Sequence, residues 1–120
     1  MSPSNSDGIL YHNPRCSKSR ASLELLKDNN INPEIVLYLD KPPNADALEL
    51  LISKLGMTPR ELLRPNEQEC KDLNLLDGSV DDKSIIKAMV QHPRLIERPI
   101  YVKGDKAIIG RPPEQVLEII

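Results

Sequence analysis

The sequence predicts an α/β fold in which a small mixed β-sheet is flanked by helices. Two observations predict it. The first 39 residues contain a strand, a helix and a second strand, and the last 21 contain two short strands followed by a helix. The block between these halves shows helical patterns only. With 120 residues, the chain is long enough for one hydrophobic core and too short for two ordinary domains.

The first half begins with a short apolar run at Ile9–Tyr11, which predicts a strand. Ser17–Asp28 carries apolar residues on one helical face with charges between them, and Asn29-Asn30 follows as a helix end. Glu34–Leu39 is rich in apolar and β-favouring residues and is bounded by prolines, so we predict a strand there.

The middle block carries helix start and stop signals. Asn44 can cap a helix that Gly56 closes, and Thr58-Pro59-Arg60-Glu61 has the pattern of a capping box with proline at the first helical position. His92-Pro93 stops the final helix of the block. The predicted helices are Ala45–Leu55, a short helix ending near Leu63, one or two turns within Glu67–Leu73, and Asp82–Gln91 with a cap in Ser79–Asp82.

The last half predicts a β-hairpin and a helix. Ile100–Lys103 and Ala107–Ile109 are short strands joined around Gly104-Asp105, and Pro113–Ile120 has a helical pattern. The order β-α-β, helices, β-β-α is the thioredoxin-like plan with a helical insertion between its halves. We expect residues 9–120 to form a single domain and residues 1–8 to form a flexible N-terminal tail.

Composition and charge exclude several classes of function. A formal net charge of −2, no Phe or Trp and only three Tyr argue against nucleic-acid binding. No apolar run approaches the roughly 18 residues that span a bilayer. Two cysteines are too few for a disulfide framework, and no export signal is present, so we expect a cytoplasmic protein. We also expect a monomer without a bound metal or cofactor, since no metal-ligand spacing or glycine-rich phosphate loop occurs.

Cys16 is the strongest candidate for a catalytic residue. It lies where the first strand ends in a proline-containing turn and the first helix begins. Unpaired backbone N–H groups and the positive end of the helix dipole favour a thiolate at such a junction. The alternative is a buried, inert cysteine. Ser19 stands where a C-x-x-C pair would have its second cysteine, so Cys16 needs an external thiol to release a product.

Two neighbouring side chains have open roles. His12 either supports the thiolate and exchanges a proton, or shapes the turn through hydrogen bonds. Ser19 either donates a hydrogen bond to the thiolate or satisfies a backbone group in the first helical turn. Cys70 lies in an acidic helical segment, where neighbouring carboxylates disfavour a thiolate, so we expect it to be non-catalytic; a resolving role is the alternative.

Three arginines lie in loops beside proline. Arg64 ends a predicted helix, Arg98 precedes a strand and Arg111 follows one. Arginine suits oxyanions because its planar guanidinium donates paired hydrogen bonds and stays charged. Singly, each suits a surface position; together with a thiolate and a helix N-terminus, they indicate an anion site.

These residues resemble the glutaredoxin-linked arsenate reductase family of the ArsC type, in its shorter branch. The resemblance runs from Ile9 to Ile120. It rests on five motifs in order: Tyr-His-Asn-Pro-Arg-Cys (11–16), Leu-Tyr-Leu-Asp-Lys-Pro-Pro (37–43), Leu-Leu-Arg-Pro-Asn (62–66), Gln-His-Pro-Arg-Leu-Ile-Glu-Arg-Pro-Ile (91–100) and Gly-Arg-Pro-Pro-Glu (110–114). The family has a thioredoxin-like fold with a helical insertion.

The resemblance implies a set of roles. Cys16 would be the nucleophile, with His12 and Ser19 as its supporting residues. Arg64, Arg98 and Arg111 would bind arsenate or a similar oxyanion, and Pro99 would follow a cis peptide that lines the site. Glutathione would be the co-substrate and glutaredoxin the partner that resolves the mixed disulfide.

Two other functions remain open. One is a thiol oxidoreductase or glutathione-binding module of the same fold with another substrate. The other is a non-enzymatic regulator like the Spx relatives, which bind RNA polymerase. Those proteins often carry a C-x-x-C switch, which Ser19 removes here.

Overall fold

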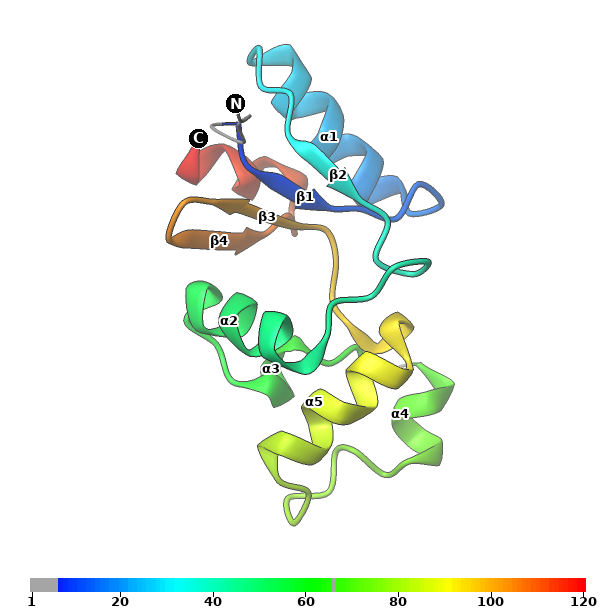
Figure 1. Cartoon of the computed structure of the whole chain (residues 1–120). Helices are drawn as coiled ribbons and strands as arrows, with labels where there is room; N and C mark the ends of the chain where they lie inside the picture. Colours follow the sequence, from blue (N-terminus) through cyan, green and yellow to red (C-terminus); the bar gives the residue numbers. More distant parts are fainter. Residues whose placement is uncertain (1–6, 66) are drawn as a thin grey trace. The chain divides into compact units, whose positions relative to one another are not determined.

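The computed structural model describes residues 7–65 and 67–120 (Figure 1). Residues 1–6, which make up most of the predicted tail, and Asn66, within the third motif, lie outside the described residues. The chain divides into two compact units. Met1–Lys41 and Arg98–Ile120 form one, called here the sheet unit, and Pro42–Glu97 forms the other, called the helical unit.

The sheet unit is built on four strands in the order β2-β1-β3-β4. β1 pairs in parallel with β2 and antiparallel with β3, and β3 pairs antiparallel with β4. This mixed sheet with flanking helices confirms the predicted α/β, thioredoxin-like class. The elements of the unit are β1 (Ile9–Tyr11), α1 (Ser17–Asp28), β2 (Glu34–Val36), β3 (Ile100–Lys103), β4 (Lys106–Ile109) and η3 (Pro113–Ile119).

The core of the sheet unit lies where α1 and η3 pack together on one face of the sheet. Leu10 of β1 pairs with Tyr101 of β3, so both side chains point to the same face. They meet Leu26 of α1 and Val116 of η3, and all four are fully buried. Burying each such side chain contributes roughly 1.5–3 kcal/mol, so this cluster holds α1 firmly on the sheet.

Two elements of the sheet unit differ from the prediction. The second strand ends at Val36 rather than Leu39, because the Leu37 carbonyl accepts hydrogen bonds from the N–H groups of Asp40 and Lys41 and forms a turn. The last helix is a 3₁₀ helix, in which the Gln115 N–H donates to the Pro112 carbonyl at 3.0 Å.

Asp7 and Gly8 are tied to the sheet. The Asn32 N–H donates to Asp7 Oδ2, the Tyr101 hydroxyl donates to the Asp7 carbonyl, and the Glu34 N–H donates to the Gly8 carbonyl. Gly8 has φ +85°, and a Cβ there would collide with the Val102 carbonyl. These two residues therefore belong structurally with the start of β1.

The helical unit contains α2 (Ala45–Leu55), α3 (Pro59–Leu62), α4 (Gln68–Asp72), α5 (Asp82–Gln91) and the 3₁₀ helix η2 (Pro93–Leu95), which the sequence patterns did not predict. α5 packs against α2, α3 and η2. Capping interactions present in the structure account for the predicted ends of α2 and α3. Asn44 Oδ1 accepts from the Ala47 N–H, Gly56 adopts the left-handed conformation, and the capping box at Thr58 and Glu61 forms in both directions.

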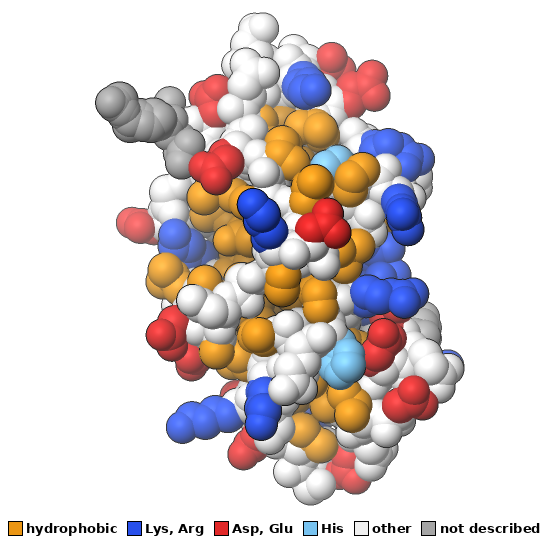
Figure 2. Space-filling view, turned by 45° about the vertical axis from the view of Figure 1, so that its right-hand side comes forward, with side chains coloured by type: hydrophobic (Ala, Val, Ile, Leu, Met, Phe, Trp, Pro, Cys, Tyr) orange, Lys and Arg blue, Asp and Glu red, His pale blue; other side chains and the backbone are white. Residues whose placement is uncertain are grey.

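Large hydrophobic side chains remain exposed in both units, and Figure 2 shows such side chains between charged ones of both signs. They are Ile35, Leu37, Leu39 and Ile120 in the sheet unit and Leu50, Leu73 and Leu76 in the helical unit. Within residues 7–65 and 67–120, no helix has the length and apolar character needed to cross a membrane.

Candidate active site

Cys16 is the N-cap residue of α1, at the end of the loop that leaves β1. Its backbone is extended, with φ −95° and ψ 124°, and its side chain makes no capping hydrogen bond. The preceding turn is held by Asn13, whose carbonyl accepts from the Cys16 N–H and whose side-chain Oδ1 accepts from the Arg15 N–H, both at 3.0 Å. The turn therefore presents the thiol over the first turn of α1.

The surroundings of Cys16 favour its thiolate. Burial raises the pKa of the thiol, but other groups outweigh it. The backbone N–H of Ser19 and the positive charge of Arg98 are the largest of these, followed by the Lys18 N–H and the charge of Arg111. The net result is a pKa below the ordinary value of 9.0. This is the effect that the strand-to-helix junction predicts.

Arg98 and Arg111 come together because the β3–β4 hairpin pairs Ile100 with Ile109, which puts the flanking residues at one end. Arg111 Nε donates to the Arg98 carbonyl at 3.1 Å, and the Gly110 N–H donates to the Pro99 carbonyl at 2.9 Å. The Arg98-Pro99 peptide is cis, as the resemblance implied, and so is Arg111-Pro112. Two of the three predicted arginines thus lie near Cys16.

The Ser19 side chain holds the loop that carries Cys16 through hydrogen bonds. Its side chain is fully buried, and its Oγ accepts from the Asn13 N–H at 3.0 Å. The same Oγ lies 2.6 Å from His12 Nδ1. The Ser19 hydroxyl therefore satisfies a backbone group of the loop before α1 rather than one in the first helical turn, while the backbone N–H of Ser19 acts on the thiolate.

His12 is buried beside Ser19, and its pKa is lowered by burial and then by the charges of Arg20 and Lys27. These effects favour the neutral imidazole. A neutral ring can accept a hydrogen bond from the Ser19 hydroxyl at Nδ1. This favours the role in which His12 shapes the turn over the role in which a charged imidazolium supports the thiolate.

Arg64 belongs to the helical unit. Its N–H donates to the Leu95 carbonyl at 2.8 Å, and its guanidinium lies 3.3 Å from Glu67 Oε2 and 4.0 Å from Glu97 Oε1. Its side chain is 25% exposed. The oxyanion-binding role that the resemblance implies for Arg64 stays a prediction.

Cys70 is buried, as Cys16 is at 8% exposure, but burial is what sets the direction of its pKa shift. It is 1% exposed within α4, and burial raises the pKa of its thiol. The cause is loss of solvent rather than the neighbouring carboxylates to which the sequence pattern pointed. A protonated, buried thiol agrees with the expected non-catalytic role.

Two residues of this site were missed by sequence reasoning. Asn13 shapes the turn, and the Asn-Pro dipeptide is a signal that could have revealed it. Gly110 is required by close packing, since a Cβ there would collide with Ser22 Oγ and lie 2.8 Å from Pro99 Cγ. The described residues hold no group of three or more His, Cys, Asp or Glu arranged to bind a metal ion.

Comparison with known proteins agrees with this arrangement. The model of the ArsC family matches residues 11–119, which include Cys16, both arginines of the hairpin and Arg64. The chain belongs to the ArsC family. The family resemblance predicted from the five motifs is therefore confirmed.

Several proteins similar to this ArsC-family chain are named arsenate reductases. The chain is 56% identical to the uncharacterized protein YfgD of Escherichia coli K12 over 92% of this chain and 94% of that one. It is 47% identical to an arsenate reductase of Haemophilus influenzae, with 93% and 97% covered. The solved structure of an arsenate reductase from Vibrio cholerae superposes with a TM-score of 0.91 at 46% identity, covering 93% and 96%.

Proposed function

We propose that this protein reduces arsenate to arsenite through the Cys16 thiolate, with glutathione and glutaredoxin as reductants. The observation that carries the proposal is the lowered pKa of Cys16 beside the charges of Arg98 and Arg111. A thiolate supplies the nucleophile, and two guanidinium groups offset the charge of an oxyanion that approaches it. Relatives named arsenate reductases over nearly the whole chain support arsenate as that oxyanion.

The first step forms a sulfur–arsenic bond. The Cys16 thiolate attacks As(V), and one arsenate oxygen leaves as hydroxide, which takes a proton to become water. Arsenic stays As(V) in this step, and the cysteine sulfur is not yet oxidised. Arg98 and Arg111 stabilise the additional negative charge of the transition state because their fixed positive charges already lie near the sulfur.

The second step transfers two electrons. A glutathione thiolate attacks the Cys16 sulfur, the sulfur–arsenic bond breaks, and its electron pair leaves with arsenic, which becomes As(III) and departs as arsenite. Cys16 is left in a mixed disulfide with glutathione. A glutaredoxin thiolate then attacks the glutathione sulfur and frees Cys16.

The supporting residues have separate roles in this proposal. Ser19 and His12 hold the loop, and the Ser19 backbone N–H stabilises the thiolate. Because Ser19 replaces the second cysteine of a C-x-x-C pair, Cys16 depends on an external thiol for its reduction. Arg64 is predicted to assist oxyanion binding.

A coupled assay tests the proposal. NADPH consumption is measured with arsenate, glutathione, glutaredoxin and glutathione reductase present. Arsenate-dependent turnover is expected for the unchanged chain and for Cys70→Ser, and no turnover above background for Cys16→Ser. Arg111→Met is expected to lower kcat/KM for arsenate by roughly 100–1000-fold, the range found when a group that stabilises transition-state charge is removed.

A different result would separate the two enzymatic hypotheses. If Cys16 reduces glutathione mixed disulfides but arsenate gives no turnover, the protein is a thiol oxidoreductase with another substrate. Equal arsenate turnover by Cys16→Ser and the unchanged chain would overturn the proposal outright.

A further inference from the structure

A groove runs along α1 on the exposed side of the sheet unit. Its volume is about 480 Å³. The lining residues are His12, Pro14, Arg20, Leu23, Glu24 and Lys27. The proposed chemistry at Cys16 uses His12 to hold the loop, but it gives no role to the two exposed cations, Arg20 and Lys27.

One end of the groove lies beside the Cys16 loop, where Pro14 and Arg20 line it. Arg20 and Lys27 are four and eleven residues after Cys16, a spacing that keeps all three on one side of the helix. At 1.5 Å per residue, they lie roughly 6 Å and 16 Å from Cys16 along the helix axis. Cys16 itself is buried and does not line the groove, so a ligand there lies beside the loop that carries the thiol.

The charges in the groove are available to a ligand. Arg20 Nη1 donates to the Pro14 carbonyl at 2.7 Å, which directs the guanidinium toward the Cys16 loop. The positive charges of Arg20 and Lys27 both act on His12, so they converge on the same region. Across residues 7–65 and 67–120, no ion pair neutralises either cation with Glu24.

We propose that this groove binds the carboxylate-bearing peptide of the small thiol that reduces Cys16. The inference rests on the proposed function, because it names a binding place for the reductant of the same cysteine. Two cations suit two carboxylates, and Glu24 suits one ammonium group, which together are the charges of a glutathione-like tripeptide. Such a peptide extends over roughly 10 Å, which matches the interval from Arg20 to Lys27.

The apolar residues of the groove fit the same ligand. Leu23 is half-buried between the charged residues and offers a surface for the methylene groups of an extended peptide. Pro14 offers a second one at the end near Cys16. A mixed wall of this kind favours a short charged peptide over a purely inorganic anion.

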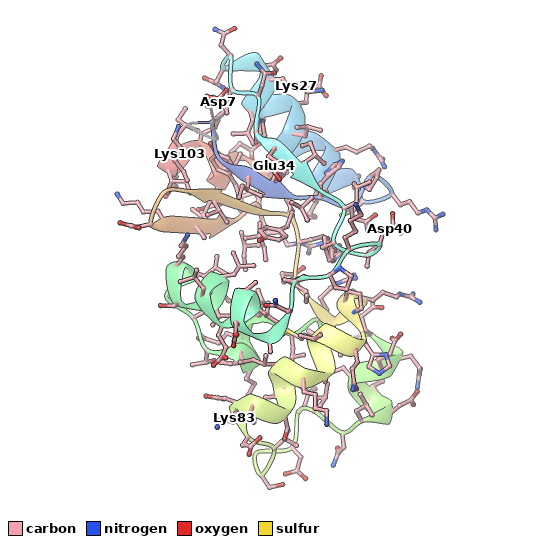
Figure 3. All side chains as sticks on the ribbon, in the orientation of Figure 1. Asp7, Lys27, Glu34, Asp40, Lys83 and Lys103 are labelled. Atoms are coloured by element: carbon pink, nitrogen blue, oxygen red, sulfur yellow. The ribbon has the colours of Figure 1, made fainter. Side chains whose placement is uncertain are left out.

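The test compares two charge reversals in the full chain carrying Cys16→Ser. Lys27→Glu changes the groove, and Lys103→Glu makes the same charge change on the β3–β4 hairpin; Figure 3 labels both lysines. Binding of S-methylglutathione, which cannot react, is titrated by calorimetry and by amide NMR shifts. Thermal melting of each variant checks that it is folded.

We expect Lys27→Glu to weaken binding by about fivefold, because the reversal removes one ion pair and places a negative charge beside the ligand carboxylate. Lys103→Glu is expected to bind within twofold of the parent, and the NMR shifts should cluster on residues 20–27. Equal binding by both variants, shifts elsewhere, or no binding by the parent would overturn the inference. Because no arsenate is present, this outcome is independent of whether the protein reduces arsenate.

A kinetic readout accompanies the binding test. In the otherwise unchanged chain, Lys27→Glu is expected to raise the KM for glutathione with little change in kcat, whereas a structural role would lower kcat as well. A loss of kcat with unchanged KM would contradict the inference.

Discussion

Gly110→Ala tests the packing that holds the hairpin end against α1. A Cβ at residue 110 would collide with Ser22 Oγ, lie 2.8 Å from Pro99 Cγ and lie 3.1 Å from Val116 Cγ1. Optimal separations between non-bonded carbon atoms are roughly 3.5–4.0 Å. The Pro99 ring must therefore move by roughly 1 Å, and the α1 side chain must move as well.

The cost follows from how firmly these neighbours are held. Ser22 and Val116 are both fully buried, and the Ser22 hydroxyl donates to the Pro113 carbonyl at 3.3 Å. Overpacking a buried site of this kind costs about 1–3 kcal/mol. Domains of this size lose roughly 3–6 °C in Tm for each kcal/mol, so we expect a fall of about 3–18 °C.

The assay is thermal melting followed by circular dichroism, repeated in urea to obtain the free energy of unfolding. Gly78→Ala is the matched control, because a Cβ there meets nothing within 4 Å. It should change the free energy of unfolding by no more than about 0.5 kcal/mol. If Gly110→Ala melts at the same temperature as Gly78→Ala, the packing argument is wrong.

Four further predictions concern the thiols and a helix cap. Alkylation of Cys16 by iodoacetamide should be fast at neutral pH and slow as the pH falls through its lowered pKa, and Arg111→Met should raise that pKa. Because the Cys16 pKa is lower in the folded chain than in the unfolded chain, the thiolate stabilises the fold. This stability is complete above the unfolded pKa of about 9 and is lost as the pH falls through the folded pKa. The difference in the free energy of unfolding between the unchanged chain and Cys16→Ser should therefore shrink as the pH falls. Ellman's reagent should detect one fast thiol that Cys16→Ser removes, while Cys70 reacts only on unfolding; a fast thiol left in that variant would refute this. Thr58→Ala breaks the capping box and should lower the free energy of unfolding by about 0.5–2 kcal/mol in urea titrations, whereas no change would mean that the cap with Glu61 is weak in solution.

Elements that depend on local chemistry could be predicted from the sequence. α1 begins and ends at the predicted residues because its apolar spacing and the Asn29-Asn30 stop are local signals. The second strand was predicted too long because strand length depends on a partner. β1 offers only three residues to pair with, so the chain turns after Val36 although Leu37 and Leu39 favour a strand.

In the candidate site, too, features that depend on local sequence could be predicted, and those that depend on the folded chain could not. The activated thiol follows from one junction in the sequence, and the approach of Arg98 and Arg111 follows from a hairpin of four pairs. The role of the Ser19 hydroxyl could not be predicted, because the spacing allows it to reach either the thiol or the loop backbone. Only the folded turn, with the Asn13 N–H pointing at Oγ, distinguishes the two.

The two ends of the β3–β4 hairpin differ: one carries the site arginines, and the other is the turn that joins the strands. Its arginines flank one end, while Gly104, in the left-handed conformation, forms the turn at the other, four residues or roughly 13 Å away. Lengthening a loop costs only about 0.6 kcal/mol for each doubling. The turn at residues 104–105 is therefore a suitable insertion point for an epitope or a reporter domain, because it lies at the end of the hairpin away from the two arginines.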